Sequence, residues 1–188
     1  MYMYKRDMYK KICITNRHLV NGDYIEKIEQ ILKKDIDYII LREKDLSESE
    51  YYTLAQQVIA LAGNKCILHN FVSVAEKLGH NKIHLSMEEF MKLSYSQKLI
   101  FDTIGVSTHT VQEAISAQQN GATYITASHI FATDCKKNLA PRGLNYLSEV
   151  KSSISIPVYA LGGINPTNQD LCLKAGADGI CMMSEYMK

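Results

Sequence analysis

The 188-residue chain lacks a strong excess of charge of either sign. Lysine and arginine together number 21, and aspartate and glutamate 20, so the formal net charge is +1 at pH 7. This balance removes the main electrostatic argument for nucleic acid as a partner. The chain also has no apolar run near the length of a membrane-spanning helix, so we expect no membrane partner. A local site that binds an anion, such as a phosphate, is compatible with this charge balance.

Paired cysteines are missing too. The five cysteines are scattered singly, and none has a partner at the spacing of a zinc motif, so the sequence predicts no zinc site. Cys13, Cys66 and Cys181 lie inside apolar runs, where a free cysteine behaves as a small core residue. The odd number of cysteines and the lack of a signal-peptide pattern favour the reducing cytoplasm.

No linker or low-complexity segment divides the chain, and its length suits one domain over residues 1–188. Short apolar runs alternate with helical patterns. Strands are expected at residues 11–15, 37–42, 65–69, 82–85, 101–106, 123–126, 157–161 and 179–183. Helices are expected at 24–33, 47–61, 72–78, 87–93, 110–120, 144–151 and 165–175, with a loop at 94–98. This order predicts a TIM (β/α)8 barrel of parallel strands with the last helix nearly absent; a doubly wound open sheet, which needs fewer strands, is the alternative.

Two of these helices have specific start signals. Ser47 followed by Glu50 three residues later is the pattern of a capping box. Asn165 followed by Pro166 is typical of an N-cap with proline at the first helical position.

The segment 128–137 gathers the most reactive side chains. It follows the apolar run at 123–126, and barrel enzymes place their chemistry at the carboxyl ends of strands. His129 is a candidate acid–base residue, because a histidine with a pKa of about 6.5 takes and gives protons at neutral pH. A structural role is the alternative for a lone histidine. Cys135 offers a thiol as an alternative nucleophile, but no sequence feature indicates an activated thiolate. Lys136 and Lys137 add positive charge beside His129.

Two cations follow the second expected strand. Side chains alternate along extended backbone, so Arg42 and Lys44 can point the same way, toward the barrel mouth. Together they suit a phosphate, a pyrophosphate or a carboxylate. The alternative is a structural ion pair between Arg42 and Glu43 or Asp45.

Other strand ends give further candidates. Asn70 can bond a polar ring or cap the next helix, and Ser107 points from the end of the fifth strand. Glu88 and Glu89 can ligate a metal, but acidic residues also favour the first turn of a helix, which is the interpretation we prefer.

The seventh and eighth loops carry the pattern of a phosphate cradle. Gly162 and Gly163 follow the seventh expected strand, and Ser184 follows the eighth. TIM barrels commonly bind phosphate between these two loops, and glycine lets backbone N–H groups approach the anion.

Five segments together resemble the thiamine phosphate synthase superfamily: LREK at 41–44, GVSTH at 105–109, FATDCK at 131–136, LGGI at 161–164 and GICMMS at 179–184. The resemblance implies one of two activities. Synthases couple hydroxymethylpyrimidine diphosphate to a thiazole phosphate, release pyrophosphate and use Mg²⁺. TenI-type thiazole tautomerases isomerise a carboxythiazole phosphate to its aromatic form without a metal.

The sequence departs from the synthase pattern in four places. Synthases carry glutamine where Ile40 stands, and Asn-Asp where this chain has either His69-Asn70 or Asn70-Phe71. On both alignments the magnesium-binding aspartate is missing, and the second metal aspartate aligns with Glu89. Where synthases have Gly-Pro, this chain has Ser128-His129.

The resemblance therefore favours the tautomerase branch, in which the histidine at the position of His129 is the proposed acid–base residue. It implies that a small phosphorylated thiazole binds in a homodimer, and that no cofactor is needed; Mg²⁺, with Glu89 as a ligand, is expected only for a synthase. A thiazole phosphate binder without catalysis is a third possibility. The implied phosphate ligands are Gly162, Gly163 and Ser184, and the implied substrate contacts are Arg42, Lys44, Asn70, Ser107, Thr133 and Lys136.

Overall fold

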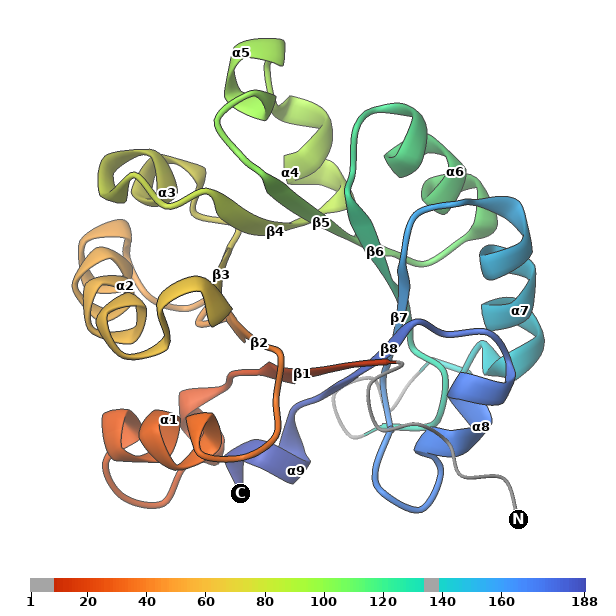
Figure 1. Ribbon diagram of the computed structural model, residues 1–188, viewed down its shortest axis with the longest axis horizontal. Helices are drawn as coiled ribbons and strands as arrows, with labels where there is room; N and C mark the ends of the chain where they lie inside the picture. Colours follow the sequence, from red (N-terminus) through yellow and green to blue (C-terminus); the bar gives the residue numbers. More distant parts are fainter. Residues whose placement is uncertain (1–8, 134–138) are drawn as a thin grey trace.

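The computed structural model describes residues 9–133 and 139–188, and its centre is a closed barrel of eight parallel strands (Figure 1). Each strand pairs with the next along the chain, and β1 pairs with β8 in a register that sets Lys10 opposite Gly179. This closure confirms the predicted TIM barrel over the open sheet. The strands are β1 (Lys10–Ile14), β2 (Tyr38–Leu41), β3 (Cys66–His69), β4 (Lys82–Ser86), β5 (Thr103–Thr108), β6 (Tyr124–Ser128), β7 (Val158–Leu161) and β8 (Gly179–Met182).

Helices surround the barrel as an outer ring (Figure 1). The last of them has only four residues, as the sequence predicts. No described helix combines the length and the apolar character that crossing a membrane requires. The α-helices are α1 (Tyr24–Leu32), α2 (Glu48–Ala62), α3 (Val72–Leu78), α4 (Met87–Lys92), α5 (Tyr95–Lys98), α6 (Val111–Gln119), α7 (Gly143–Ser153), α8 (Gln169–Lys174) and α9 (Ser184–Met187); short 3-10 turns are η1 (Arg17–Leu19) and η2 (Gly63–Lys65).

The helix start signals give mixed results. Ser47 forms the predicted capping box with Glu50 at the start of α2. The expected loop at 94–98 is wrong, because Ser94 and Gln97 form a second capping box that starts α5. The expected cap at Asn165 is also wrong. Its Oδ1 accepts the backbone N–H of Thr167 in a turn at 2.9 Å, and α8 begins only at Gln169.

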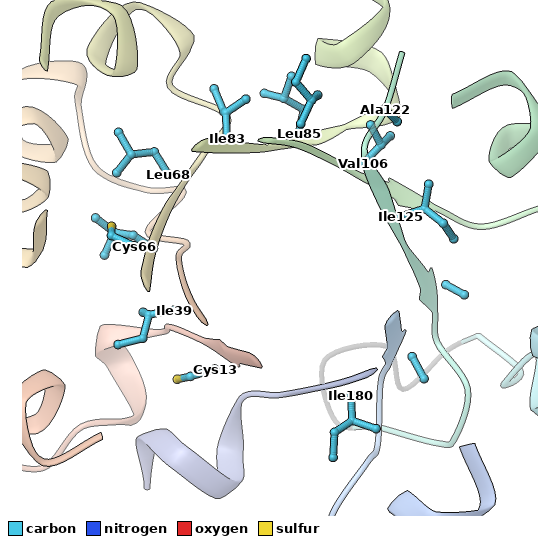
Figure 2. Packing of buried hydrophobic residues seen from close by; sticks show 14 of the residues in the cluster. Cys13, Ile39, Cys66, Leu68, Ile83, Leu85, Val106, Ala122, Ile125 and Ile180 are labelled. Atoms are coloured by element: carbon cyan, nitrogen blue, oxygen red, sulfur yellow. The ribbon is translucent and has the colours of Figure 1, made fainter. Parts of the chain in front are cut away.

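Buried side chains form two layers, because successive residues of a strand point to opposite faces. The outer layer fills the space between strands and helices, and Figure 2 shows Cys13, Ile39 and Cys66 among the side chains that point outward into it. The inner layer fills the barrel with Ile12, Ile14, Ile40, Ile67, Tyr124, Tyr159 and Cys181.

The cysteines behave as core residues. Cys13, Cys66 and Cys181 are free and buried, which confirms the prediction for these three, and Cys172 in α8 is also buried. Burial raises the pKa of Cys66 to about 12, so its thiol stays protonated at neutral pH. Cys135 lies outside the described residues.

Candidate active site

A cavity of about 230 Å³ opens at the carboxyl ends of the strands. Its described lining includes two cations, Arg42 and Lys44, and four histidines: His69, His84, His109 and His129. No aspartate or glutamate is among these described lining residues. A larger groove of about 570 Å³ adjoins the cavity and shares Thr133, Leu161, Gly162 and Met183 with it.

The predicted phosphate cradle lies in that groove. Gly162, Gly163 and Ser184 all line it, so the structure brings together the three residues expected to hold phosphate. Gly163 has a φ of +66°, and a Cβ there would collide with the backbone oxygen of Ala132. Glycine is therefore needed both for the backbone conformation and for the close approach of the sixth and seventh loops.

His129 lies at the wall of the cavity and is 4% exposed. Its Nε2 lies 3.2 Å from the backbone oxygen of Leu139. A carbonyl oxygen only accepts hydrogen bonds, so Nε2 carries the proton in the neutral ring and Nδ1 keeps a lone pair. Gly162 packs directly against the Cα and Cβ of His129 and leaves no room for a side chain of its own. The seventh loop thus holds this histidine in place.

Arg42 and Lys44 both line the cavity, as their alternation along the strand end predicts. The carboxylates between and after them do not line it. Glu43, which is 2% exposed, accepts hydrogen bonds from the Thr15 hydroxyl at 2.7 Å and from the backbone N–H of Arg17 at 3.0 Å. The two oxygens of Asp45 bind the guanidinium of Arg17 at 2.5 and 2.6 Å, which lowers the pKa of that carboxyl below its usual range.

Two buried histidines in the cavity were not predicted as site residues. The rings of His69 and His84 stack with their centroids 5.8 Å apart. Burial lowers the pKa of His84 to about 3, and the charge of Arg42 acts in the same direction. Burial is also the main cause that lowers the pKa of His69, so both rings are neutral at neutral pH. One feature of the sequence could have indicated His84: it lies in the apolar fourth strand, and Ser86, a hydroxyl residue, follows two positions later on the same face of the strand.

Some of the remaining predicted substrate contacts line the cavity, and others do not. Ser107 and Thr133 line the cavity. Asn70 is not among the lining residues; its Oδ1 accepts the backbone N–H of Ser86 at 2.9 Å and so ties the end of β3 to the end of β4. The expectation that Asn70 caps a helix is wrong, because Phe71 occupies the N-cap of α3. Lys136 and Lys137 lie outside the described residues.

The described residues do not fit a magnesium site. Magnesium prefers carboxylate oxygens together with substrate phosphates, and the described lining of the cavity offers cations and imidazoles instead. Glu89 lies in the first turn of α4, where its carboxylate binds Lys92 at 2.7 Å. Nowhere in residues 9–133 and 139–188 do three or more histidine, cysteine or acidic side chains form a group able to hold a metal.

The neutral histidines predict a loss of stability in mild acid. The pKa of His84 is lower in the folded protein than in the unfolded chain, where it is about 6.5, so below that pH the unfolded chain binds a proton that the folded protein excludes. We expect the free energy of unfolding to fall by about 1.4 kcal/mol per pH unit for one such group between about pH 6.5 and 3. Urea unfolding from about pH 7 to about pH 5 measures this slope. His84→Gln should flatten the slope, and an unchanged slope in that variant would contradict the assignment.

A closed parallel barrel with its cavity at the carboxyl ends of the strands is the organisation of the TIM-barrel enzymes. Comparison with known proteins narrows this class to one family. The family model described as thiamine monophosphate synthase matches residues 12–186, so the chain belongs to this family and is an enzyme of thiamine biosynthesis.

Named relatives and a solved structure agree with this assignment. The thiamine-phosphate synthase of Clostridium botulinum strain 657 is 34% identical over 95% of this chain and 90% of its own length. That of Clostridium novyi is 32% identical over 96% and 91%. A thiamine phosphate pyrophosphorylase from Pyrococcus furiosus superimposes with a TM-score of 0.80 at 29% identity, over 95% of this chain and 87% of that one.

Proposed function

We propose that this enzyme is a thiazole tautomerase, which isomerises a carboxythiazole phosphate to its aromatic form by proton transfer. The observation that carries the proposal is the buried His129 at the cavity wall, whose Nε2 bonds to a backbone carbonyl and whose Nδ1 is left as the basic nitrogen. Neutral imidazole is the form that a general base needs at neutral pH.

The two adjoining hollows suit the two anionic ends of this substrate. In the proposed complex, the phosphate lies in the groove against Gly162, Gly163 and Ser184. The ring then extends into the smaller cavity, with its carboxylate toward Arg42 and Lys44. The absence of acidic side chains from the described lining of that cavity supports a carboxylate there, since no like charge opposes it.

The proposed step moves one proton and changes no oxidation state overall. Nδ1 of His129 takes the proton from the ring carbon that bears the carboxylate, which breaks one C–H bond and sends its electron pair into the ring system. The imidazolium then returns the proton to the exocyclic carbon, where a new C–H bond forms and the ring becomes aromatic. Arg42 and Lys44 stabilise the negative charge that builds up between these two transfers.

Thiamine phosphate synthase is the second candidate, and the names of the relatives favour it over the first. Arg42 and Lys44 would then bind the diphosphate of the pyrimidine substrate. Ile40 at the cavity wall and the misfit of the described residues to Mg²⁺ weigh against it. A binder without catalysis would show tight thiazole phosphate binding and no turnover in any assay.

A pair of assays separates the candidates. The purified enzyme is given the non-aromatic carboxythiazole phosphate, with and without a chelator, and the aromatic product is followed by NMR. In parallel it is given hydroxymethylpyrimidine diphosphate and thiazole phosphate with Mg²⁺. We expect isomerisation that the chelator leaves unchanged. Magnesium-dependent formation of thiamine phosphate without isomerisation would overturn the proposal in favour of the synthase.

A further inference from the structure

A chain of hydrogen bonds crosses the barrel beneath the cavity, from β6 through β4 to β5. The Tyr124 hydroxyl lies 2.9 Å from Nδ1 of His84, and Nε2 of His84 lies 2.8 Å from the hydroxyl oxygen of Ser107. Tyr124 and His84 are 4% and 3% exposed; His84 and Ser107 both line the cavity, and Tyr124 does not. The chain therefore links the closed interior of the barrel to the surface that a ligand would contact.

The direction of these bonds follows from counting protons. Among the described residues, His84 is the one hydrogen-bond partner of the Tyr124 hydroxyl. A buried O–H that donates to nothing is costly, so the Tyr124 hydroxyl donates to Nδ1 of His84. Nδ1 therefore holds a lone pair, and the single proton of the neutral ring is on Nε2, which donates to Ser107.

Ser107 also accepts a second hydrogen bond, from the Thr126 hydroxyl at 3.4 Å. A serine hydroxyl has two acceptor lone pairs and one hydrogen. With both lone pairs engaged from inside the barrel, its hydrogen is left to point into the cavity. Ser107 then meets a ligand as a donor and not as an acceptor.

We propose that Tyr124 and His84 are positioning residues that fix Ser107 as a hydrogen-bond donor to the ligand carboxylate, beside Arg42 and Lys44. The floor of the cavity thereby selects for an acceptor at the end of the ligand that lies opposite the phosphate. The identity of that acceptor rests on the proposed function. A doubly protonated His84 would still donate to Ser107, but it would leave the buried Tyr124 hydroxyl without an acceptor, so the neutral ring is the form that satisfies both neighbours.

Gly105 of β5 shows that the barrel is built around this contact. A Cβ at Gly105 would collide with the Tyr124 ring and with Nδ1 of His84. Glycine weakens a strand interior and often marks a close approach. Here it gives the room in which the tyrosine and the histidine meet.

Binding of two ligands tests the proposal without any turnover. Calorimetry compares the aromatic carboxythiazole phosphate with the same thiazole phosphate lacking the carboxylate. In Ser107→Ala we expect affinity for the first to fall about tenfold or more, and affinity for the second to stay within about twofold. His84→Leu should cause the same selective loss. His84→Gln should restore most of the selectivity, because the glutamine amide can donate to Ser107.

A matched control separates positioning from stability. His80 is another buried histidine, which donates to the backbone oxygen of Cys66 at 2.9 Å and does not line the cavity. His80→Leu should lower stability and leave the ratio of the two affinities unchanged. If His84→Leu does not fold, Tyr124→Phe takes its place, with an intermediate loss of selectivity because His84 can then adopt either tautomer.

The proposal is overturned if Ser107→Ala weakens both ligands equally or neither, or if the ratios of His84→Gln and His84→Leu agree. Its failure is distinct from that of the proposed function. Selective binding without isomerisation would reject the tautomerase but support the chain of hydrogen bonds from Tyr124 through His84 to Ser107. Isomerisation with unselective binding would reject only the proposed role of that chain of hydrogen bonds.

Discussion

His129→Ala is expected to lower the rate of thiazole isomerisation by about 10²–10⁴-fold, the usual contribution of a positioned general acid–base group. The imidazole is held between the Leu139 carbonyl and the seventh loop, and alanine removes the only group there proposed to carry the proton. The measurement is kcat for formation of the aromatic product, with ligand affinity measured in parallel. Affinity should change little, because the proposed contacts to the phosphate and to the carboxylate remain.

His18 is the control for this prediction. It lies in η1 with 65% of its side chain exposed and bonds to Asp45, and it does not line the cavity. His18→Ala should keep full activity. If His129→Ala loses less than a few-fold in rate while His18→Ala behaves as expected, His129 is not the proton carrier.

Gly162→Ala is expected to reduce isomerisation by about 100-fold, because small displacements of catalytic groups carry costs of that size. Gly162 has a φ of +104°, and an alanine Cβ would overlap the Cα and Cβ of His129. The variant must therefore move His129, the seventh loop or both, and the same loop lines the groove in which we propose that the phosphate binds. Backbone strain in the variant should also lower the free energy of unfolding by about 1–3 kcal/mol.

Gly121 provides the matched comparison for Gly162. It follows α6 with a φ of +97°, and no atom lies within 4 Å of a Cβ placed there. Gly121→Ala should thus share the backbone strain without the collision, and should lose stability in urea unfolding while retaining activity. Equal rate losses in the two variants would mean that strain alone, and not the displacement of His129, explains the result.

The barrel could be predicted from the sequence because each strand is a short apolar run that is buried on both faces. Helix boundaries were less secure where a polar residue has two possible roles. Asn165 satisfies the first N–H groups of a turn before α8 begins, and a cap and a turn have the same local sequence. Ser94 and Gln97 form a capping box in a helix of only four residues, too short for any apolar period to show.

The candidate site was predictable where its residues follow strands along the chain, as Arg42, His129 and Gly162 do. The contact between the buried residues His84 and Tyr124 could not be predicted in this way. His84 and Tyr124 are 40 residues apart and become neighbours only through the order of strands in the closed barrel. In a single sequence, each one looks like an ordinary member of an apolar strand.

The segment from Arg42 to Asp45 alternates basic and acidic side chains and carries no net charge. The barrel separates them, with both cations on the cavity and both carboxylates bound to Arg17. The protein as a whole is close to neutral, so it has little long-range field to steer an anion from solution. Arg42 and Lys44 attract an anion only once it comes within about a Debye length of the cavity mouth. Substrate capture by such an enzyme therefore depends on the local field of these two cations at the cavity mouth, where no described lining residue is acidic, and added salt should slow it.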